Sequence, residues 1–178
     1  MDKLHSGEPV HAPALPTGLR DLDAILNGGI RDGQLIVIAG RPAMGKSVLG
    51  LQIASRIARK ENMNALLFSL EMTGTALTER ELAAPGDISL DAIRTGKLDE
   101  DEWARLTTAS AKIAETQVWI DETPGLSLQA LQARARRMHR QSPLGLVVVD
   151  HIGLMGVEGR YENRQQAVAM IARELKAL

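Results

Sequence analysis

Glycine, lysine and serine stand at a spacing that suits the binding of a triphosphate. Residues 40–47 fit the pattern G-x-x-x-x-G-K-[ST] without a mismatch and directly follow an apolar run, LIVIA. Glycines let such a loop turn its backbone N–H groups inward, and a following helix adds the positive end of its dipole. We expect Lys46 to reach the β- and γ-phosphates and Ser47 to bind Mg²⁺. The predicted phosphate loop comprises Gly40, Arg41, Pro42, Ala43, Met44, Gly45, Lys46 and Ser47.

A second apolar run predicts the other half of this site. Residues 145–150, GLVVVD, end in Asp150. An acid delivered by a strand beside a phosphate loop serves as a partner for Mg²⁺, directly or through water. We therefore interpret Asp150 as the metal-side acid of a site for ATP and Mg²⁺. The alternative is an aspartate that caps the turn after the strand.

Hydrolysis needs a further group that orients or deprotonates the attacking water. Glu71 follows the short apolar run at residues 65–69, and the ligands of parallel sheets gather at the carboxyl ends of strands. A solvated glutamate at the start of a helix would give the same pattern. Asp121, at the end of the run at residues 118–121, competes for the catalytic role on the same grounds.

Apolar runs that alternate with helical patterns indicate how these residues are positioned. The pattern predicts an α/β fold with a doubly wound, mostly parallel sheet flanked by helices. The expected strands cover residues 35–39, 65–69, 118–121 and 145–150, the last of them buried on both faces. The expected helices run from the cap Thr17 to Gly28, from the phosphate loop to about residue 62, across 75–114 with a break at Gly96, onward from the cap Ser127, and over 165–178.

Length and composition narrow the class of protein. The chain has 178 residues, which suits one domain over residues 17–178, preceded by an extended arm at residues 1–16 that contains three prolines. It has no cysteine, so disulfides, thiolate catalysis and cysteine-based zinc sites are excluded, and we expect a cytoplasmic location. No apolar stretch is long enough to cross a membrane, and no membrane partner is expected.

Charge and aromatic content limit how nucleic acid is held. The formal charge of −1 argues against a protein that coats nucleic acid through overall basicity. Phe68 and Trp119 lie in strand-like runs that predict burial, so a stack of bases on aromatic rings is not expected. Four arginines after Ser127 fall on more than one helix face, and we interpret them as solvated or interface charges. They are Arg134, Arg136, Arg137 and Arg140.

From Thr17 to Leu178 the chain resembles the C-terminal ATPase domain of DnaB-type replicative helicases, because six segments occur in the order found in that family. They are TGLRDLDAILNGGIRDGQLIVIAGRPAMGKS, FSLEM, IRTGKLDEDEWARL, IDETPGLSLQALQARARRMHR, GLVVVDHIGLM and ELKAL. FSLEM and IRTGKLDEDEW are more specific to this family than the phosphate loop, which many ATPases share.

The resemblance implies a RecA-like P-loop fold, a hexameric ring with ATP at each subunit interface, and single-stranded DNA in the central channel. By position, Lys46 and Ser47 would hold phosphate and Mg²⁺, Glu71 would be the catalytic glutamate, and Asp150 would be the second-strand acid. The family couples ATP hydrolysis to translocation and duplex unwinding in DNA replication, and its implied partners are primase and a helicase loader.

The loop after Asp150 is similar in place to one that faces DNA in the ring. Arg160, Asn163 and Arg164 are therefore candidate DNA contacts, with a solvated loop end as the alternative. A few charges in each subunit, repeated around a ring, reconcile a nearly neutral chain with DNA binding. His151 stands where the family usually has tyrosine, and we interpret it as a polar residue that starts the loop, with no second histidine or acid at ligand spacing.

The family pattern extends beyond the residues of this chain. There, a strand with a polar γ-phosphate sensor inserts between the strands of the phosphate loop and the acid, and an arginine finger and a further DNA-facing loop follow. The resemblance thus predicts a domain incomplete at its C-terminal end, which binds nucleotide but does not unwind processively. Two interpretations stay open beside it: a catalytically idle helicase fragment or assembly module, and another RecA-like ATPase of recombination or repair.

Overall fold

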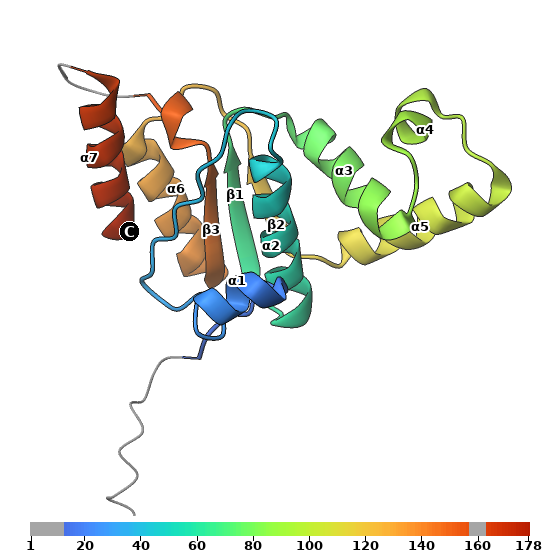
Figure 1. The fold of residues 1–178 in the computed structure, drawn as a ribbon, viewed down its shortest axis with the longest axis horizontal. Helices are drawn as coiled ribbons and strands as arrows, with labels where there is room; N and C mark the ends of the chain where they lie inside the picture. The colour runs from blue at the N-terminus through green and yellow to red at the C-terminus, as the bar shows by residue number, and fades with distance from the viewer. Residues whose placement is uncertain (1–12, 157–162) are drawn as a thin grey trace, which may run out of the picture.

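A computed structural model describes residues 13–156 and 163–178 of the chain. Helices and strands alternate, as Figure 1 shows, and the expected α/β class is confirmed. The elements in chain order are α1 (Arg20–Ile25), α2 (Lys46–Lys60), β1 (Asn64–Ser69), α3 (Gly74–Gly86), α4 (Leu90–Thr95), α5 (Glu100–Ala114), β2 (Val118–Asp121), α6 (Leu128–Gln141), β3 (Leu144–Asp150), the short 3₁₀-helix η1 (Ile152–Leu154) and α7 (Arg164–Lys176).

The three strands form one parallel sheet in the order β2-β1-β3. The register pairs Phe68 with Asp121 and Ser69 with Asp150, so the carboxyl ends of all three strands lie level with one another. Parallel neighbours need crossover connections, which α3 to α5 supply before β2 and α6 supplies before β3. Side chains that follow the strands are therefore gathered at one end of the sheet.

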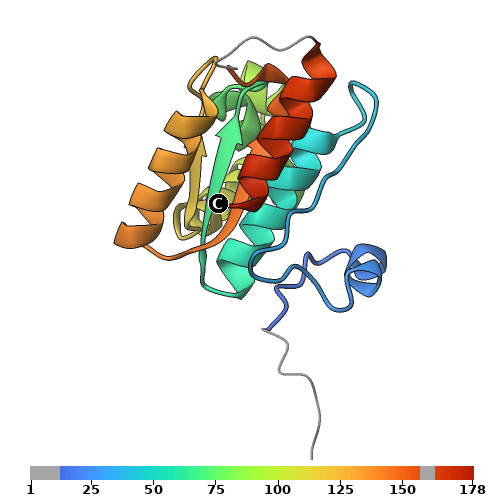
Figure 2. The same ribbon diagram turned by 90° about the vertical axis from the view of Figure 1, so that its left-hand side faces the viewer.

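Apolar side chains fill the space on both faces of the sheet. Leu66 and Phe68 of β1 belong to a cluster with residues of α6 and α7, whereas Leu67 packs with α2 and α3 on the other face. Neighbouring residues of a strand point to opposite faces, which explains this division. Figure 2 shows the sheet enclosed between α6 on one side and α2 on the other.

The strand expected at residues 35–39 is absent. The segment is irregular, it has no hydrogen-bonded neighbour among residues 13–156 and 163–178, and Val37 is 66% exposed. A strand exists only where a second strand satisfies its N–H and C=O groups. Because no described segment pairs with it, the apolar run remains irregular and exposed, and the sheet has three strands where four were expected.

Two predictions of burial are wrong because both outer strands of the sheet are edges. β3, expected to be buried on both faces, is only partly buried from Leu144 to Val149. Trp119 of β2 is 53% exposed, because the helices on its face cover β1 and β3 in preference to β2. Phe68, in the central strand, is fully buried as predicted.

Local capping chemistry explains most of the helix boundaries. Ser127 accepts a hydrogen bond from the Ala130 N–H and caps α6, as the sequence predicts. Gly96 adopts a left-handed conformation and ends α4, so the expected break within the helical region is confirmed. At α1 the expected cap is wrong: Leu19 is the N-cap, and the Thr17 backbone and hydroxyl donate to the Asp23 carboxylate.

Residues just before α1 are tied to the rest of the domain. Leu15 forms an antiparallel bridge with Ile30, and the Arg56 side chain of α2 donates to the Pro16 carbonyl at 2.8 Å. Part of the segment expected to be an arm therefore contacts the ordered fold. Within the described ranges, no helix combines the length and apolar character needed to cross a membrane.

Candidate functional site

The predicted phosphate loop leads directly into α2, whose first residue is Lys46. Gly45 caps the helix in a left-handed conformation with φ of +81°, which glycine adopts without strain. Ala43 is also left-handed, whereas Gly40 is not, so the left-handed turns of the loop fall at positions 43 and 45. The Lys46 Nζ donates to the Arg41 carbonyl at 3.1 Å, which folds the amine back over its own loop.

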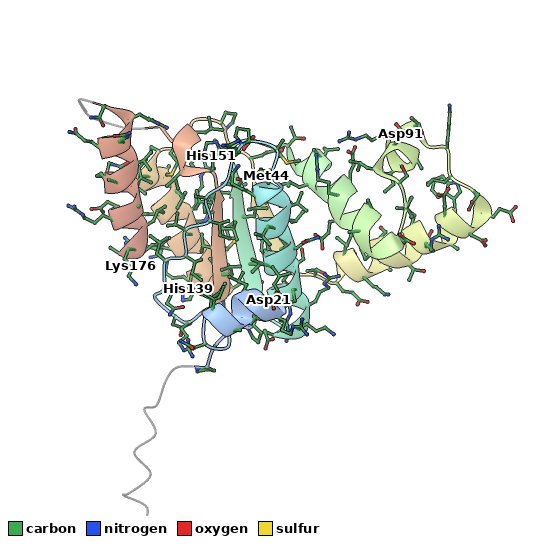
Figure 3. All side chains as sticks on the ribbon, viewed as in Figure 1. Asp21, Met44, Asp91, His139, His151 and Lys176 are labelled. Carbon is green, nitrogen blue, oxygen red and sulfur yellow. The ribbon has the colours of Figure 1, made fainter. Side chains whose placement is uncertain are left out.

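The first turns of α2 lie against the carboxyl end of β3. A Cβ added to Gly50 would come within 3.0 Å of the Val148 side chain, and Val148 lies two residues before Asp150. Figure 3 shows Met44 of the loop and His151 at the same end of the sheet. The fold therefore brings the phosphate loop and the residues that follow β3 to one end of the molecule.

Asp150 is the most informative residue at this end. It is buried, and its Oδ2 atom has no hydrogen-bond partner among the residues that the structure describes. Its backbone carbonyl accepts from the Leu70 N–H at 2.6 Å, which joins the ends of β3 and β1. Burial of an unpaired carboxylate oxygen is costly, so the geometry calls for a cation or a donor that is not part of the described protein.

This carboxylate fits a Mg²⁺ ion better than a metal that needs several protein ligands. No group of three or more His, Cys, Asp or Glu side chains gathers anywhere in residues 13–156 or 163–178. Mg²⁺ in nucleotide sites typically takes one or two protein oxygens and completes its shell with water and phosphate. Ser47, in the first turn of α2, and Asp150 together provide such a sparse set.

Glu71 and Asp121, the two candidates for the catalytic acid, differ sharply in their surroundings. Glu71 follows β1 with a half-exposed side chain that makes no hydrogen bond in the described structure. Asp121 accepts from Arg134 at 2.6 Å and from the Thr123 hydroxyl at 2.7 Å. The Asp121 carboxylate is thus occupied by hydrogen bonds within the fold. Of the two candidates, Glu71 is the one whose carboxylate makes no hydrogen bond in the described structure.

The contacts with Arg134 and Thr123 lower the pKa of Asp121. Burial raises it, but the hydrogen bonds from Arg134 and Thr123 and the positive charge of Arg134 outweigh burial and hold the pKa below its ordinary value. Arg134 therefore pairs with Asp121, although its side chain stays 44% exposed to solvent. Arg136, Arg137 and Arg140 are exposed and make no ion pair in the described part of the chain.

Glu71 has a neighbour that the sequence pattern does not predict. The His151 Nε2 atom lies 3.8 Å from the Glu71 Oε2 atom, although the two residues are far apart in the chain. The His151 Nδ1 atom accepts from the Gly153 N–H at 3.1 Å, so the residue also starts the loop as predicted. Strand order was the missing signal, because β1 and β3 are adjacent and the two residues follow their paired ends.

The candidate DNA contacts have internal roles where the structure describes them. Asn163 caps α7 by accepting from the Gln166 N–H at 3.0 Å, and Arg164 donates to the carbonyls of Gly153 and Met155. Both side chains are exposed at the surface, so these contacts do not test a role with DNA. Arg160 lies outside the described residues.

An open cavity of about 1130 Å³ lies beside this site on the α6 face of the sheet. Its lining includes Glu71, Asp121 and Trp119, together with Arg137 and Met138 of α6, and it includes no residue of the phosphate loop. The cavity exists because α6 leaves β2 uncovered. Glu71 thus stands between this groove and the end of the sheet where the loop lies.

Comparison with known proteins identifies the fold and the family. Residues 14–178 match the DnaB-like helicase C terminal domain. Two solved structures superpose on 94% or more of the chain with a TM-score of 0.85: the ATPase domain of G40P, at 25% identity, and a DnaB-like replicative helicase described with its interactions with primase, at 24%. The present chain covers 60% of the G40P chain and 42% of the DnaB-like helicase chain.

Relatives of known function are more similar in sequence. The replicative DNA helicase DnaB of Geobacillus stearothermophilus is 41% identical over 92% of this chain, and the replicative DNA helicase DnaC of Bacillus subtilis is 38% identical over the same share. The chain spans about 36% of the length of each of these proteins. On these matches and on its α/β architecture, the chain belongs to the DnaB-like helicase C-terminal domain family.

Proposed function

We propose that this chain is the ATP-binding and ATP-hydrolysing motor domain of a hexameric replicative DNA helicase, which couples hydrolysis to movement on single-stranded DNA and to duplex unwinding. One observation carries the proposal: the buried Asp150, whose Oδ2 atom has no partner in the described structure, ends the strand on which α2 packs, and α2 directly continues a sequence that fits the phosphate-loop pattern. Primase is a reasonable partner, because a solved DnaB-like helicase with the same fold is described with it.

Binding of the triphosphate is assigned to the loop and to Lys46. In the described structure, Met44 is the one residue of 40–45 whose backbone N–H donates a hydrogen bond to another backbone group, and the helix dipole adds positive potential to the remaining N–H groups. Lys46 would exchange the Arg41 carbonyl for phosphate oxygens. Because the amine already lies over the loop, little reorganisation accompanies this exchange.

Magnesium is assigned to Ser47 and Asp150. Bound Mg²⁺ would stabilise the negative charge that grows on the phosphate oxygens during transfer. Asp150 would hold the ion directly or through a water molecule, and its burial keeps the carboxylate in one orientation.

Activation of water is assigned to Glu71. Its carboxylate is free of hydrogen bonds in the described structure and follows the strand next to Asp150. In this position it can accept a proton from a water molecule on the far side of the γ-phosphate. Asp121 is assigned a structural role, because Arg134 and Thr123 already occupy its oxygens.

The test compares Glu71→Gln with the parent chain. We expect ATP affinity, measured by calorimetry, to stay within about threefold, and turnover with single-stranded DNA to fall by about 100-fold or more. Asp121→Asn is the matched control, and it should retain turnover at a pH where it is folded. Binding without turnover in the parent chain would favour an idle nucleotide-binding module, and absence of ATP binding would contradict the proposal.

A further inference from the structure

Two side chains that follow adjacent strands face each other at the end of the sheet. Glu71 lies two residues beyond β1, and His151 lies one residue beyond β3. Their Oε2 and Nε2 atoms are 3.8 Å apart, and both side chains are about half exposed, at 48% and 42%. A separation of 3.8 Å is longer than a hydrogen bond, and a small rotation of either side chain closes it.

The loop after β3 determines which nitrogen of His151 carries the proton. Nδ1 accepts a hydrogen bond from the Gly153 N–H at 3.1 Å, so its lone pair is occupied. In a neutral imidazole the proton is then on Nε2, the atom that faces Glu71. A donor therefore points toward a carboxylate that has no other hydrogen bond in the described structure.

The ring of His151 is held by its own loop and not by Glu71. A Cβ added to Gly153 would come within 2.6 Å of the His151 Cε1 and Nδ1 atoms, so the ring packs closely on the glycine backbone. Arg164 in turn donates to the Gly153 carbonyl. The imidazole is thus a fixed donor, whereas the Glu71 side chain makes no hydrogen bond in the described structure that fixes its rotamer.

We propose that His151 is a positioning residue for Glu71: its imidazole holds one carboxylate oxygen through Nε2–H, and the second oxygen is left to accept the proton of water. This inference rests on the proposed role of Glu71 in hydrolysis. His151 acts through the Glu71 carboxylate and is not itself the base. Orientation matters because a free glutamate samples many rotamers, and fixing one of them at the moment of reaction costs conformational entropy.

The first test measures the contact in the nucleotide-free chain by NMR of ¹⁵N-labelled histidine side chains. At pH of about 8.5, where free imidazole is neutral, we expect His151 to carry its proton on Nε2, and Glu71→Gln to shift that resonance. His139 is an internal control, because its Nδ1 accepts from the Leu144 N–H at 3.0 Å and no acid pairs with it in the described structure. Figure 3 labels His139 well away from His151. A proton on Nδ1 of His151, or a Glu71→Gln response no larger than that of His139, would overturn the proposal.

The second test separates the two nitrogens by mutation. His151→Asn keeps an acceptor for the Gly153 N–H and removes the Nε2–H donor that faces Glu71. His151→Gln has a side-chain amide N–H that reaches Glu71 in place of Nε2–H. We expect His151→Asn to lower kcat by about 10- to 100-fold with KM for ATP within about twofold, and His151→Gln to restore part of kcat. His139→Asn is the matched control and should leave both constants unchanged.

The Glu71→Gln background shows whether His151 acts through the carboxylate. There, His151→Asn should cause no further loss of turnover, because the residue that it positions is already inactive. Equal losses in both backgrounds, or a His151→Asn variant with the parent kcat, would refute the positioning role. If the parent chain itself hydrolyses no ATP, the proposed function fails, and the NMR comparison alone decides whether His151 holds Glu71.

Discussion

Lys46 shows how much of the site is already arranged before a ligand arrives. Its amine donates to the Arg41 carbonyl of the same loop, and the loop is exposed. An ammonium group on a flexible stem would otherwise sample many positions. The contact holds the charge close to where the loop N–H groups point, so binding replaces one acceptor with a stronger one.

Removal of this amine should weaken nucleotide binding without unfolding the chain. We expect Lys46→Ala to raise the Kd for ATP by about 10- to 100-fold, the usual cost of a lost hydrogen bond to a charged group. Lys60→Ala, at the other end of α2 and also exposed, is the control and should bind ATP like the parent chain. Calorimetric titration measures both, and equal affinities for all three chains would contradict the assignment of the loop.

Residue types and spacing predict individual candidates for the site but not the contacts between them. Gly45 and Lys46 were recognisable from their pattern, because backbone geometry and charge demand those residues locally. The proximity of His151 to Glu71 and the ion pair between Asp121 and Arg134 were not. Both depend on which strands are neighbours in the sheet, and the sequence of one chain does not state that order.

At the scale of elements, the Asp121 carboxylate joins β2 to α6. It accepts hydrogen bonds from Arg134 of the helix and from Thr123 in the connecting turn. Because these contacts lower its pKa in the folded chain, Asp121 stabilises the fold at pH values above the ordinary carboxyl range, and this contribution is lost as the pH falls through that range.

Asp121→Asn should therefore make stability less dependent on pH. We expect the parent chain to exceed the variant in free energy of unfolding at a pH of about 6, and the difference to shrink as the pH is lowered to about 3. Urea denaturation followed by circular dichroism at both pH values measures it. A difference that grows on acidification would mean that the ion pair is not the source of the lowered pKa.

The amino end of α5 is stabilised by a reciprocal cap. The Asp99 side chain accepts from the Glu102 N–H at 2.7 Å, and the Glu102 side chain accepts from the Asp99 N–H at 3.0 Å. Asp99→Ala removes this pair and should lower the free energy of unfolding by about 1 kcal/mol. Asp101→Ala, which removes an exposed acid from the same turn but no cap, should cost less. Equal losses in the two variants would assign the effect to charge and not to the cap.

Helices were predicted more reliably than strands, for a physical reason. A helix satisfies its backbone within one segment, so caps such as Ser127 and Gly96 are enough to define its ends. A strand depends on a partner elsewhere in the chain. The apolar run at 35–39 has the composition of a strand, yet no described segment pairs with it, and its residues remain irregular.

The molecule as a whole presents this run as an exposed apolar segment. Leu35, Val37 and Ile38 are between 39% and 66% exposed, beside a sheet whose edge strand β3 has a free side in the described structure. Unpaired strand-like segments of this kind promote association between copies of a chain. We expect the apparent mass in size-exclusion chromatography to rise with protein concentration.

A charge in the segment should oppose this association. Val37→Lys is expected to raise the concentration at which association is half complete by about 10-fold, the equivalent of exposing one valine side chain. Ile25→Lys is the matched control, because Ile25 is 77% exposed but lies on α1 and outside this segment. A parent chain that stays monomeric at all concentrations, or an equal effect of both variants, would contradict the prediction.

The hydrogen bond between Arg56 and the Pro16 carbonyl has a mechanical consequence. Lys46 and Arg56 belong to one helix, about 15 Å apart along its axis. A helix packed on a sheet moves as a rigid body. A displacement of the backbone at Pro16 is therefore transmitted through Arg56 and α2 to the predicted phosphate loop without passing through any other loop. A force on the segment before α1 should therefore change the affinity for nucleotide at the start of α2, and bound nucleotide should in turn change the position of that segment.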